Sequence, residues 1–528
     1  MYRQTSPGQL SFENFYLPFG GKLSGENRWV KLAAMIPWET FESSYAAQFS
    51  EGRGAPAKSF RMALGALIIK ERLGVSDDET VEQVRENPYL QYFLGLSEYS
   101  DRAPFDASMM THFRQRLSLE LVSQVNEAVV QSVLVPEACD AGAMDTEAAP
   151  PTTTEPVDTS DNADDNSDPP TADDDPPHQG QLLLDATVAP ADIHYPTDLH
   201  LLNQARASSE RILDQLWATI RQPGQRKPRT YRQQARRNVL KVAKQRRPNR
   251  RQIRKAIGQQ LRYLRRNLEQ IRQVVADGAQ FEVLAGFWYQ RLLVIQEVYR
   301  QQGLMYQQRQ HRVEHRIVSL AQPHVRPIVR GKAGTPVEFG AKLAVSYVQG
   351  FCFIDHLDWE AFNEALDLPQ QVERYKDRFG VYPESVHADQ IYRTRTNRQW
   401  CKAQGIRLSG PPLGRPAATA KPDLERQAQQ DARIRNAIEG KFGQGKRRFS
   451  LNRVMAKLPH TAATTMAITV LVMNLEQRLR PLVLFFVRLT HRYFIKAIAL
   501  LTSLKRVRWQ AALGGRRWSN QTALSSLR

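Results

Sequence analysis

Residues 431–450, DARIRNAIEGKFGQGKRRFS, place an isolated carboxylate, Glu439, among bases. Glu439 stands four residues after Arg435 and seven before Lys446, and residues four apart share one side of a helix. One acid among bases suits an enzyme that binds a metal ion and a polyanion together, because the acid ligates the cation while the bases neutralise phosphates. The alternative is an ordinary helix on which Glu439 only pairs with Arg435.

The spacing of apolar residues in this stretch predicts a helix. Its expected apolar stripe consists of Ile434, Ala437, Ile438 and Phe442. Because glycine is a poor helix former, we expect Gly440, Gly443 and Gly445 to end or loosen the helix.

The whole chain has 528 residues, 41% of them apolar, which is enough for several folded domains and excludes a disordered protein. A net charge of +19 predicts an anionic partner, nucleic acid first and an anionic membrane second. The three cysteines are far apart, so we expect a reducing cytosol, no disulfide framework and no zinc site. The chain begins without a signal sequence and its apolar runs are too short for a membrane span, which predicts a soluble cytoplasmic protein.

Residues 1–135 have the pattern of an all-helical domain. A first helix should run from Phe60 to the stop signal at Gly74, a second should be capped by Asp77 or Asp78, and a third should start at Asp106. The third helix would turn its basic residues outward, namely His112, Arg114 and Arg116. This domain is either a helix-turn-helix DNA reader, with Arg114 as a DNA contact, or a helical bundle with an ordinary solvated face.

Residues 136–180 have the composition of a disordered acidic linker. Its part from 137 to 175 contains thirteen Asp and Glu and no Lys or Arg, so the rest of the chain carries +32 against the total of +19. The linker could be a plain spacer or a DNA mimic that folds back on a basic groove.

The apolar run 182–184 has the length of a buried strand, and Asp185 stands at its end. A carboxylate at the end of a buried strand is costly unless it is paired or bound to a metal, so Asp185 is a candidate site residue. Asp198 fits a helix N-cap, and Asp192 fits a loop.

Residues 199–315 are predicted to form a long helical insertion. Its part from 221 to 266 contains eighteen Lys and Arg and no Asp or Glu. Such a run is either a solvated face or a surface for sequence-independent contacts with the DNA backbone. The candidate phosphate contacts are Arg246, Arg247, Arg250 and Arg251.

The chain after the insertion predicts an antiparallel meander, with strands at 328–330, 341–348 and 350–354. A helix should follow at 359–379, then a short strand at 386–388 that ends in Asp389. The next stretch is basic, and its Arg393 is a candidate DNA contact. Residues 334–342 do not form a phosphate-binding loop, because their glycine spacing is wrong.

Three acids now stand in the order Asp185, Asp389, Glu439. Two divalent cations need several hard oxygen ligands from different elements, and such a pair activates water or a 3′-hydroxyl and stabilises the leaving oxygen. The pattern predicts phosphodiester chemistry.

In this order and at these spacings, the segments resemble bacterial insertion-sequence transposases of the DDE class, in the group of insertion-sequence families four and five. The third-acid region of that group resembles Tyr, two residues, Arg, three residues, Glu, six residues, Lys. Arg435, Glu439 and Lys446 fit it, whereas Ala432 stands in the place of the tyrosine. The segments LLLDAT and HADQIYRTRTN are similar to the first- and second-acid segments.

The resemblance implies an α/β fold, with a ribonuclease H-like mixed-sheet core at 181–460 that contains the long helical insertion. An all-α N-terminal DNA-binding domain would precede the core, and a basic helical segment, 461–528, would follow it.

The resemblance also implies a nucleoid-associated transposase that binds terminal inverted repeats, cleaves the ends and joins them to target DNA. Asp185, Asp389 and Glu439 would hold two Mg²⁺, with Mn²⁺ as a substitute, in a homodimer or higher multimer. Arg435 and Lys446 would contact phosphates. The alternatives are a structure-specific nuclease without strand transfer and a noncatalytic repressor derived from a transposase.

Overall fold

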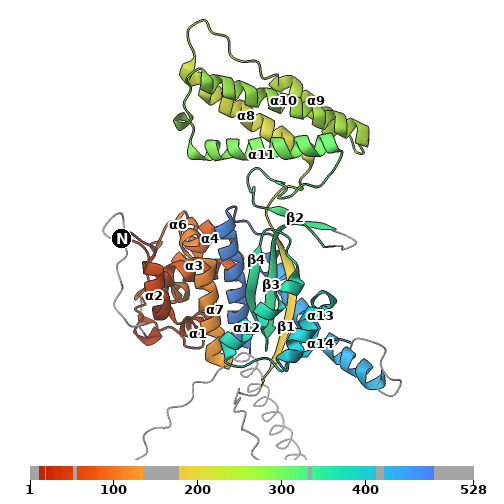
Figure 1. Ribbon diagram of the computed structural model, residues 1–528. Coiled ribbons are helices and arrows are strands. Elements are labelled where there is room, and N and C mark those ends of the chain that lie inside the picture. Colours follow the sequence, from red (N-terminus) through yellow and green to blue (C-terminus); the bar gives the residue numbers. More distant parts are fainter. Residues whose placement is uncertain are drawn as a thin grey trace, which may run out of the picture.

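The computed structural model describes residues 11–17, 20–50, 56–134, 178–330, 336–411 and 421–480. Most of the predicted acidic linker and the C-terminal residues 481–528 lie outside the described residues. The described chain forms an N-terminal helical unit, a central sheet with its own helices, and a helical bundle beyond one end of the sheet (Figure 1). None of the helices in these ranges is long and apolar enough to cross a bilayer.

The sheet in the described residues has six strands in the order β2-β3-β1-β5-β6, and β4 also pairs with β3. β3 is antiparallel to β1, β2 and β4, whereas β1, β5 and β6 run parallel to one another. The strands are β1 (Gln181–Pro190), β2 (Arg326–Val329), β3 (Val337–Val348), β4 (Phe351–Asp358), β5 (Ser385–Ala388) and β6 (Arg407–Leu408). This mixed sheet confirms the predicted fold class and is consistent with a ribonuclease H-like core.

The predicted meander is confirmed, because β2, β3 and β4 are consecutive antiparallel strands. β3 and β4 are joined by a tight turn in which Gln349 and Gly350 both have positive φ, 47° and 101°. The prediction that Asp185 ends its strand is wrong. β1 continues to Pro190, because the residues after Asp185 pair with β3 from Ala344 back to Gly340.

Helices on either side of the sheet complete the core: η4 (Glu364–Leu366), α12 (Leu368–Phe379), η5 (Gln390–Tyr392), α13 (Arg395–Ala403), α14 (Lys421–Arg448) and η7 (Ser450–Asn452). The helix predicted at 359–379 begins only at Leu368, since η4 and the connecting residue Asp367 precede it. Strand and helix residues, among them Leu184, Val386 and Val372, share an apolar cluster.

α14 runs through all three of its glycines, so the prediction that they end or loosen the helix is wrong. The reason is packing. A Cβ on Gly445 would lie 2.7 Å from Leu451 Cδ1 and 3.2 Å from Met473 Sδ, so glycine lets α14 approach its neighbours closely. Gly440 is different, because a Cβ there would meet no atom within 4 Å.

The N-terminal unit contains more helices than the three predicted: η1 (Phe12–Asn14), α1 (Arg28–Met35), α2 (Trp38–Ala46), α3 (Phe60–Leu73), α4 (Asp77–Glu86), α5 (Pro88–Phe93), α6 (Met109–Arg116) and α7 (Leu119–Leu134). The predicted stop at Gly74 is confirmed, with φ of 70° at the end of α3. α4 is capped by Ser76 and not by Asp77 or Asp78, since the Ser76 side chain accepts from Glu79 N.

The N-terminal unit and the sheet share one apolar core through a helix at 459–480. Apolar residues of this helix, such as Leu471, pack in the same cluster as α3 and β3. Buried polar contacts add to the junction, since Glu71 on α3 accepts from Ser450 N (2.9 Å) and from Thr469 Oγ1 (2.7 Å).

The insertion forms a bundle with its own apolar cluster and stands beyond the ends of β1 and β2 (Figure 1). Its elements are α8 (Asp198–Ile220), α9 (Arg232–Ala243), α10 (Arg250–Ala276), η3 (Phe281–Val283) and α11 (Gly286–Gln308). Thr197, not Asp198 as predicted, caps α8. Inside the bundle, the buried Arg206 donates to Glu210 (2.5 Å) and Gln260 (3.1 Å), which ties α8 to α10.

Candidate active site

The pairing of β1 with β5 brings the first two acids together. The last parallel pair in the register is Leu184 with Ala388, so the next residues are Asp185 on β1 and Asp389 directly after β5. Asp389 is exposed and caps η5 by accepting from Gln390 N at 2.7 Å. Asp185 is more buried and accepts from Ala186 N at 2.8 Å.

α14 brings the third acid to the same edge, because the helix contacts both β1 and β5. Arg435 Nη1 donates to Asp389 Oδ1 at 2.7 Å, and Arg435 Nη2 donates to Glu439 Oε1 at 3.4 Å. One guanidinium therefore lies between the second and third acids. The alternative from the sequence, that Glu439 only pairs with Arg435, describes half of this arrangement, since Arg435 also holds Asp389.

Asp185 lies in an environment that disfavours its charge. Burial is the largest cause that raises the pKa of Asp185 to about 6, and the carboxylates of Glu364 and Asp389 also raise it. The hydrogen bond from the Ala186 N–H and the charge of Arg435 lower this pKa. Glu364 was missed by the sequence analysis. It stands on η4 and pairs with Lys342 Nζ at 2.7 Å, which brings a fourth carboxylate near the site.

The donor chemistry of the three acids fits a divalent ion. All three supply hard carboxylate oxygens from separate elements, and a cation would relieve the charge that burial disfavours at Asp185. In the described residues no three His, Cys, Asp or Glu side chains converge closely enough to hold a metal ion. Arg435 instead supplies the positive charge next to Asp389 and Glu439.

A second ion pair holds α14 on the sheet one turn before Arg435. Asp431 accepts two hydrogen bonds from Arg407 of β6, at 2.9 and 3.1 Å. Burial alone would raise the pKa of Asp431, but Arg407 holds this pKa below its ordinary value. Asp431, Arg435 and Glu439 are spaced by four, so one face of α14 carries the anchor, the bridging arginine and the third acid. The spacing of four could have indicated from the sequence that Asp431 shares the face of Arg435 and Glu439, but Asp431 was not predicted as a site residue.

Asp431 also faces His387 on β5, with Nδ1 at 3.4 Å, and His387 Nε2 lies 3.1 Å from Ser385 Oγ. A histidine between a serine and an aspartate is the arrangement of a hydrolase triad, but all three side chains are buried. Burial also lowers the pKa of His387. The group is therefore a structural link between β5 and α14.

The predicted DNA contacts lie in different surroundings. Arg393 donates to Ala388 O at 3.0 Å, beside the second acid, and Lys446 lies half-buried in the last turn of α14. Arg114 does not point outward as predicted, because its guanidinium is largely buried and pairs with Asp77. The four arginines near the turn between α9 and α10 are all exposed: Arg246, Arg247, Arg250 and Arg251.

Comparison with known proteins gives two family matches. A model described as a transposase DDE domain matches residues 386–476, which include Asp389 and Glu439. A model described as a transposase domain (DUF772) matches residues 18–116, within the N-terminal unit.

One curated relative is an uncharacterized protein, ORF8 in the nfe locus of Rhizobium meliloti, which is 33% identical over 135 residues. The match covers 25% of this chain and 65% of the relative. No solved structure matches the chain. These matches do not distinguish one insertion-sequence family from another, so the group of families four and five stays a prediction. The two matched parts of the chain are similar to transposase domains and, together with the mixed sheet, support a bacterial insertion-sequence transposase of the DDE class.

Proposed function

We propose that this chain binds the terminal inverted repeats of its own element, cleaves the DNA there and joins the 3′ ends to target DNA. The observation that carries the proposal is that Asp185 and Asp389 follow the last paired residues of β1 and β5, while Arg435 on α14 bridges Asp389 to Glu439. The match of residues 386–476, which include the second and third acids, to a transposase DDE domain supports it.

Transposases of this class generally use divalent metal ions, and we propose Mg²⁺, with Mn²⁺ as a substitute, held by the three acids. Bound cations of this kind activate a water or a 3′-hydroxyl and stabilise the leaving oxygen. Asp185 must be ionised to serve as a ligand. Because burial disfavours this ionised form, nearby positive charge should favour metal binding at Asp185. Arg435, which now neutralises Asp389 and Glu439, lies where its guanidinium can turn to a DNA phosphate.

DNA affinity would come largely from the insertion. Its exposed arginines near the α9–α10 turn carry no carboxylate partner within the described residues, so a DNA backbone can neutralise them. Arg393 and Lys446 would contact phosphates nearer the acids. Two ends must be held together for joining, which implies a homodimer or a higher multimer.

The test uses the inverted repeats found in the DNA that flanks the gene. The protein should cut duplexes that carry these repeats in Mg²⁺ and should be inert in EDTA. Pre-cut ends incubated with a plasmid should give joined product. Cleavage without joining would favour the structure-specific nuclease, and specific binding without cleavage would favour the noncatalytic repressor.

A further inference from the structure

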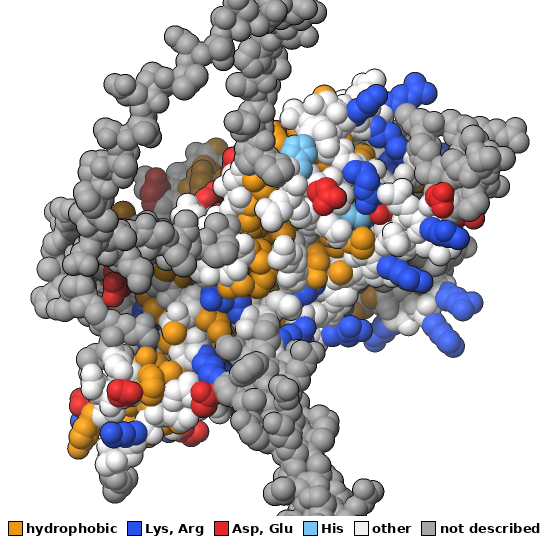
Figure 2. Space-filling view, turned by 90° about the horizontal axis from the view of Figure 1, so that it is seen from below, with side chains coloured by type: hydrophobic (Ala, Val, Ile, Leu, Met, Phe, Trp, Pro, Cys, Tyr) orange, Lys and Arg blue, Asp and Glu red, His pale blue; other side chains and the backbone are white. Residues whose placement is uncertain are grey.

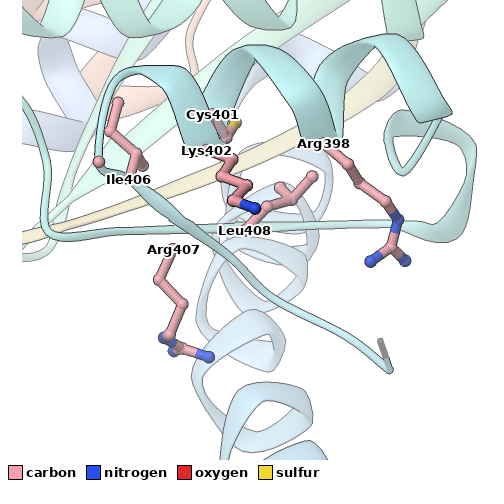
Figure 3. A pocket seen from close by; sticks show the side chains of 7 residues that line it. Arg398, Cys401, Lys402, Ile406, Arg407 and Leu408 are labelled. Carbon is pink, nitrogen blue, oxygen red and sulfur yellow. The ribbon is translucent and has the colours of Figure 1, made fainter. Parts of the chain in front are cut away.

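A shallow basic pocket of about 380 Å³ lies between α13 and β6 (Figure 3). Arg398 and Lys402 project from α13, and Arg407 projects from β6. Cys401 and Ile406 are buried behind them. Arg398 and Lys402 are four residues apart and therefore share one face of α13.

Two of the three cations in this pocket are uncompensated. Arg407 is bound by Asp431, but in the part of the chain that the structure describes no carboxylate lies within ion-pair distance of Arg398 or Lys402. Two adjacent positive charges repel each other, and their repulsion is relieved when an anion binds between them.

The walls of the pocket are joined by hydrogen bonds to the elements that carry the acids. Arg398 Nε donates to Arg393 O at 3.4 Å, and Arg393 Nη2 donates to Ala388 O, the residue before Asp389. The other wall, Arg407, is joined to Asp431 on α14. Lys and Arg side chains also gather on the side of the molecule where α13 and α14 lie (Figure 2). A strand that passes the acids can therefore continue over this basic surface.

We propose that this pocket binds a phosphodiester group of the DNA strand whose scissile phosphate lies at the acids. The proposal rests on the proposed function and adds a subsite to it. Arg398 and Lys402 hold the phosphate oxygens, while Arg407, fixed by Asp431, lines the same pocket.

The first experiment measures affinity for an end-containing duplex in EDTA, so that cleavage plays no part. The double variant Arg398→Ala with Lys402→Ala should weaken DNA binding about tenfold at low salt. The slope of log K against log salt should become shallower by about 0.9, because the protein then neutralises one phosphate fewer. Arg398→Lys with Lys402→Arg keeps both charges and should bind nearly as the wild type does. Both pairs of side chains lie on the surface, and circular dichroism checks that the variants fold.

The second experiment locates the phosphate by a disulfide cross-link. Lys402→Cys, in a Cys139→Ala background, should link to a duplex that carries a thiol tethered to a phosphate beside the cleavage position. Thr396→Cys is the matched control, because Thr396 is exposed on α13 but turned away from Arg398.

These outcomes separate the subsite from the function. If the wild type binds DNA and the double alanine variant binds equally tightly with the same salt slope, the subsite is wrong and the proposed function stands. Equal cross-linking from Thr396→Cys would also overturn the subsite. If the wild type binds no DNA, both proposals fail.

Discussion

The arginines on and beside α14 and the arginines at the α9–α10 turn of the insertion have opposite surroundings. Near the acids, two arginines are held by carboxylates: Arg435 by Asp389 and Glu439, and Arg407 by Asp431. Near the α9–α10 turn, exposed arginines such as Arg246 have no carboxylate partner within the described residues. A paired arginine fixes the position of a neighbour, whereas an unpaired one is available to a polyanion. Changes in the core should therefore alter chemistry and stability, and changes in the insertion should alter affinity.

The largest effect is expected at the three acids. Asp185→Asn, Asp389→Asn and Glu439→Gln keep nearly the same volume but remove a hard, charged ligand. Cleavage and strand transfer should each fall by several orders of magnitude, while DNA binding persists. Gel assays of cleavage, joining and mobility shift measure all three.

Two other acids sharpen this prediction. Asp192→Asn is the control, because Asp192 pairs with Arg453 in a loop and should leave most activity intact. If Glu439→Gln cleaves at nearly the wild-type rate while Glu425, an exposed acid earlier on α14, proves essential, then Glu439 is the wrong third acid.

The next effect concerns the insertion. Replacing its four exposed arginines, Arg246, Arg247, Arg250 and Arg251, by Ala should weaken binding to end-containing and random duplexes alike. The slope of log K against log salt should become shallower by about 0.9 for each phosphate that the protein no longer neutralises. Thermal stability should change little. If only end-specific binding falls, these residues read bases, and the contrast with the core would need a different explanation.

The candidate site could be predicted where it depends on local pattern. A short apolar run followed by an acid indicated Asp389, and the one acid among bases indicated Glu439. The parts that failed depend on contacts between residues far apart in the chain. The close approach of Leu451 and Met473 requires a glycine at position 445 inside α14, and the pairing with β3 extends β1 beyond Asp185. No pattern near either residue reveals such contacts.

Other features of the fold show the same limit. Acids suggested the caps of α4 and α8, but the neighbouring Ser76 and Thr197 supply them, because a cap depends on which side chain reaches the first free N–H groups. The helix at 459–480 joins the N-terminal unit to the sheet, and its apolar pattern alone does not say which partners it packs against.

A smaller effect is expected at the anchor of α14. Asp431→Ala leaves Arg407 without its partner, and because Arg407 is partly exposed the loss of stability should be about 1–3 kcal/mol, less than for a fully buried pair. Cleavage should fall about tenfold or more, because Arg435 and Glu439 lose their fixed position. Thermal unfolding and cleavage rates measure the two effects.

The control for the anchor lies on the same helix. Asp423 is exposed and pairs with Arg426, which is also exposed, so Asp423→Ala should change both quantities little. Equal losses from Asp431→Ala and Asp423→Ala would show that general helix stability, not the anchor, sets the rate.

The smallest effects on cleavage are expected at two glycines of α14. These variants test whether packing positions this helix as its charges do. Gly445→Ala forces a methyl group against Leu451 and Met473, which should cost about 1–3 kcal/mol of stability and lower the cleavage rate. Gly440→Ala meets open space, so it should stabilise the helix by about 0.5–1 kcal/mol and leave binding unchanged. The thermal midpoints of the two variants should therefore move in opposite directions. If both rise, α14 has room to shift at Gly445, and its position must be set mainly by the ion pairs of Asp431 and Arg435.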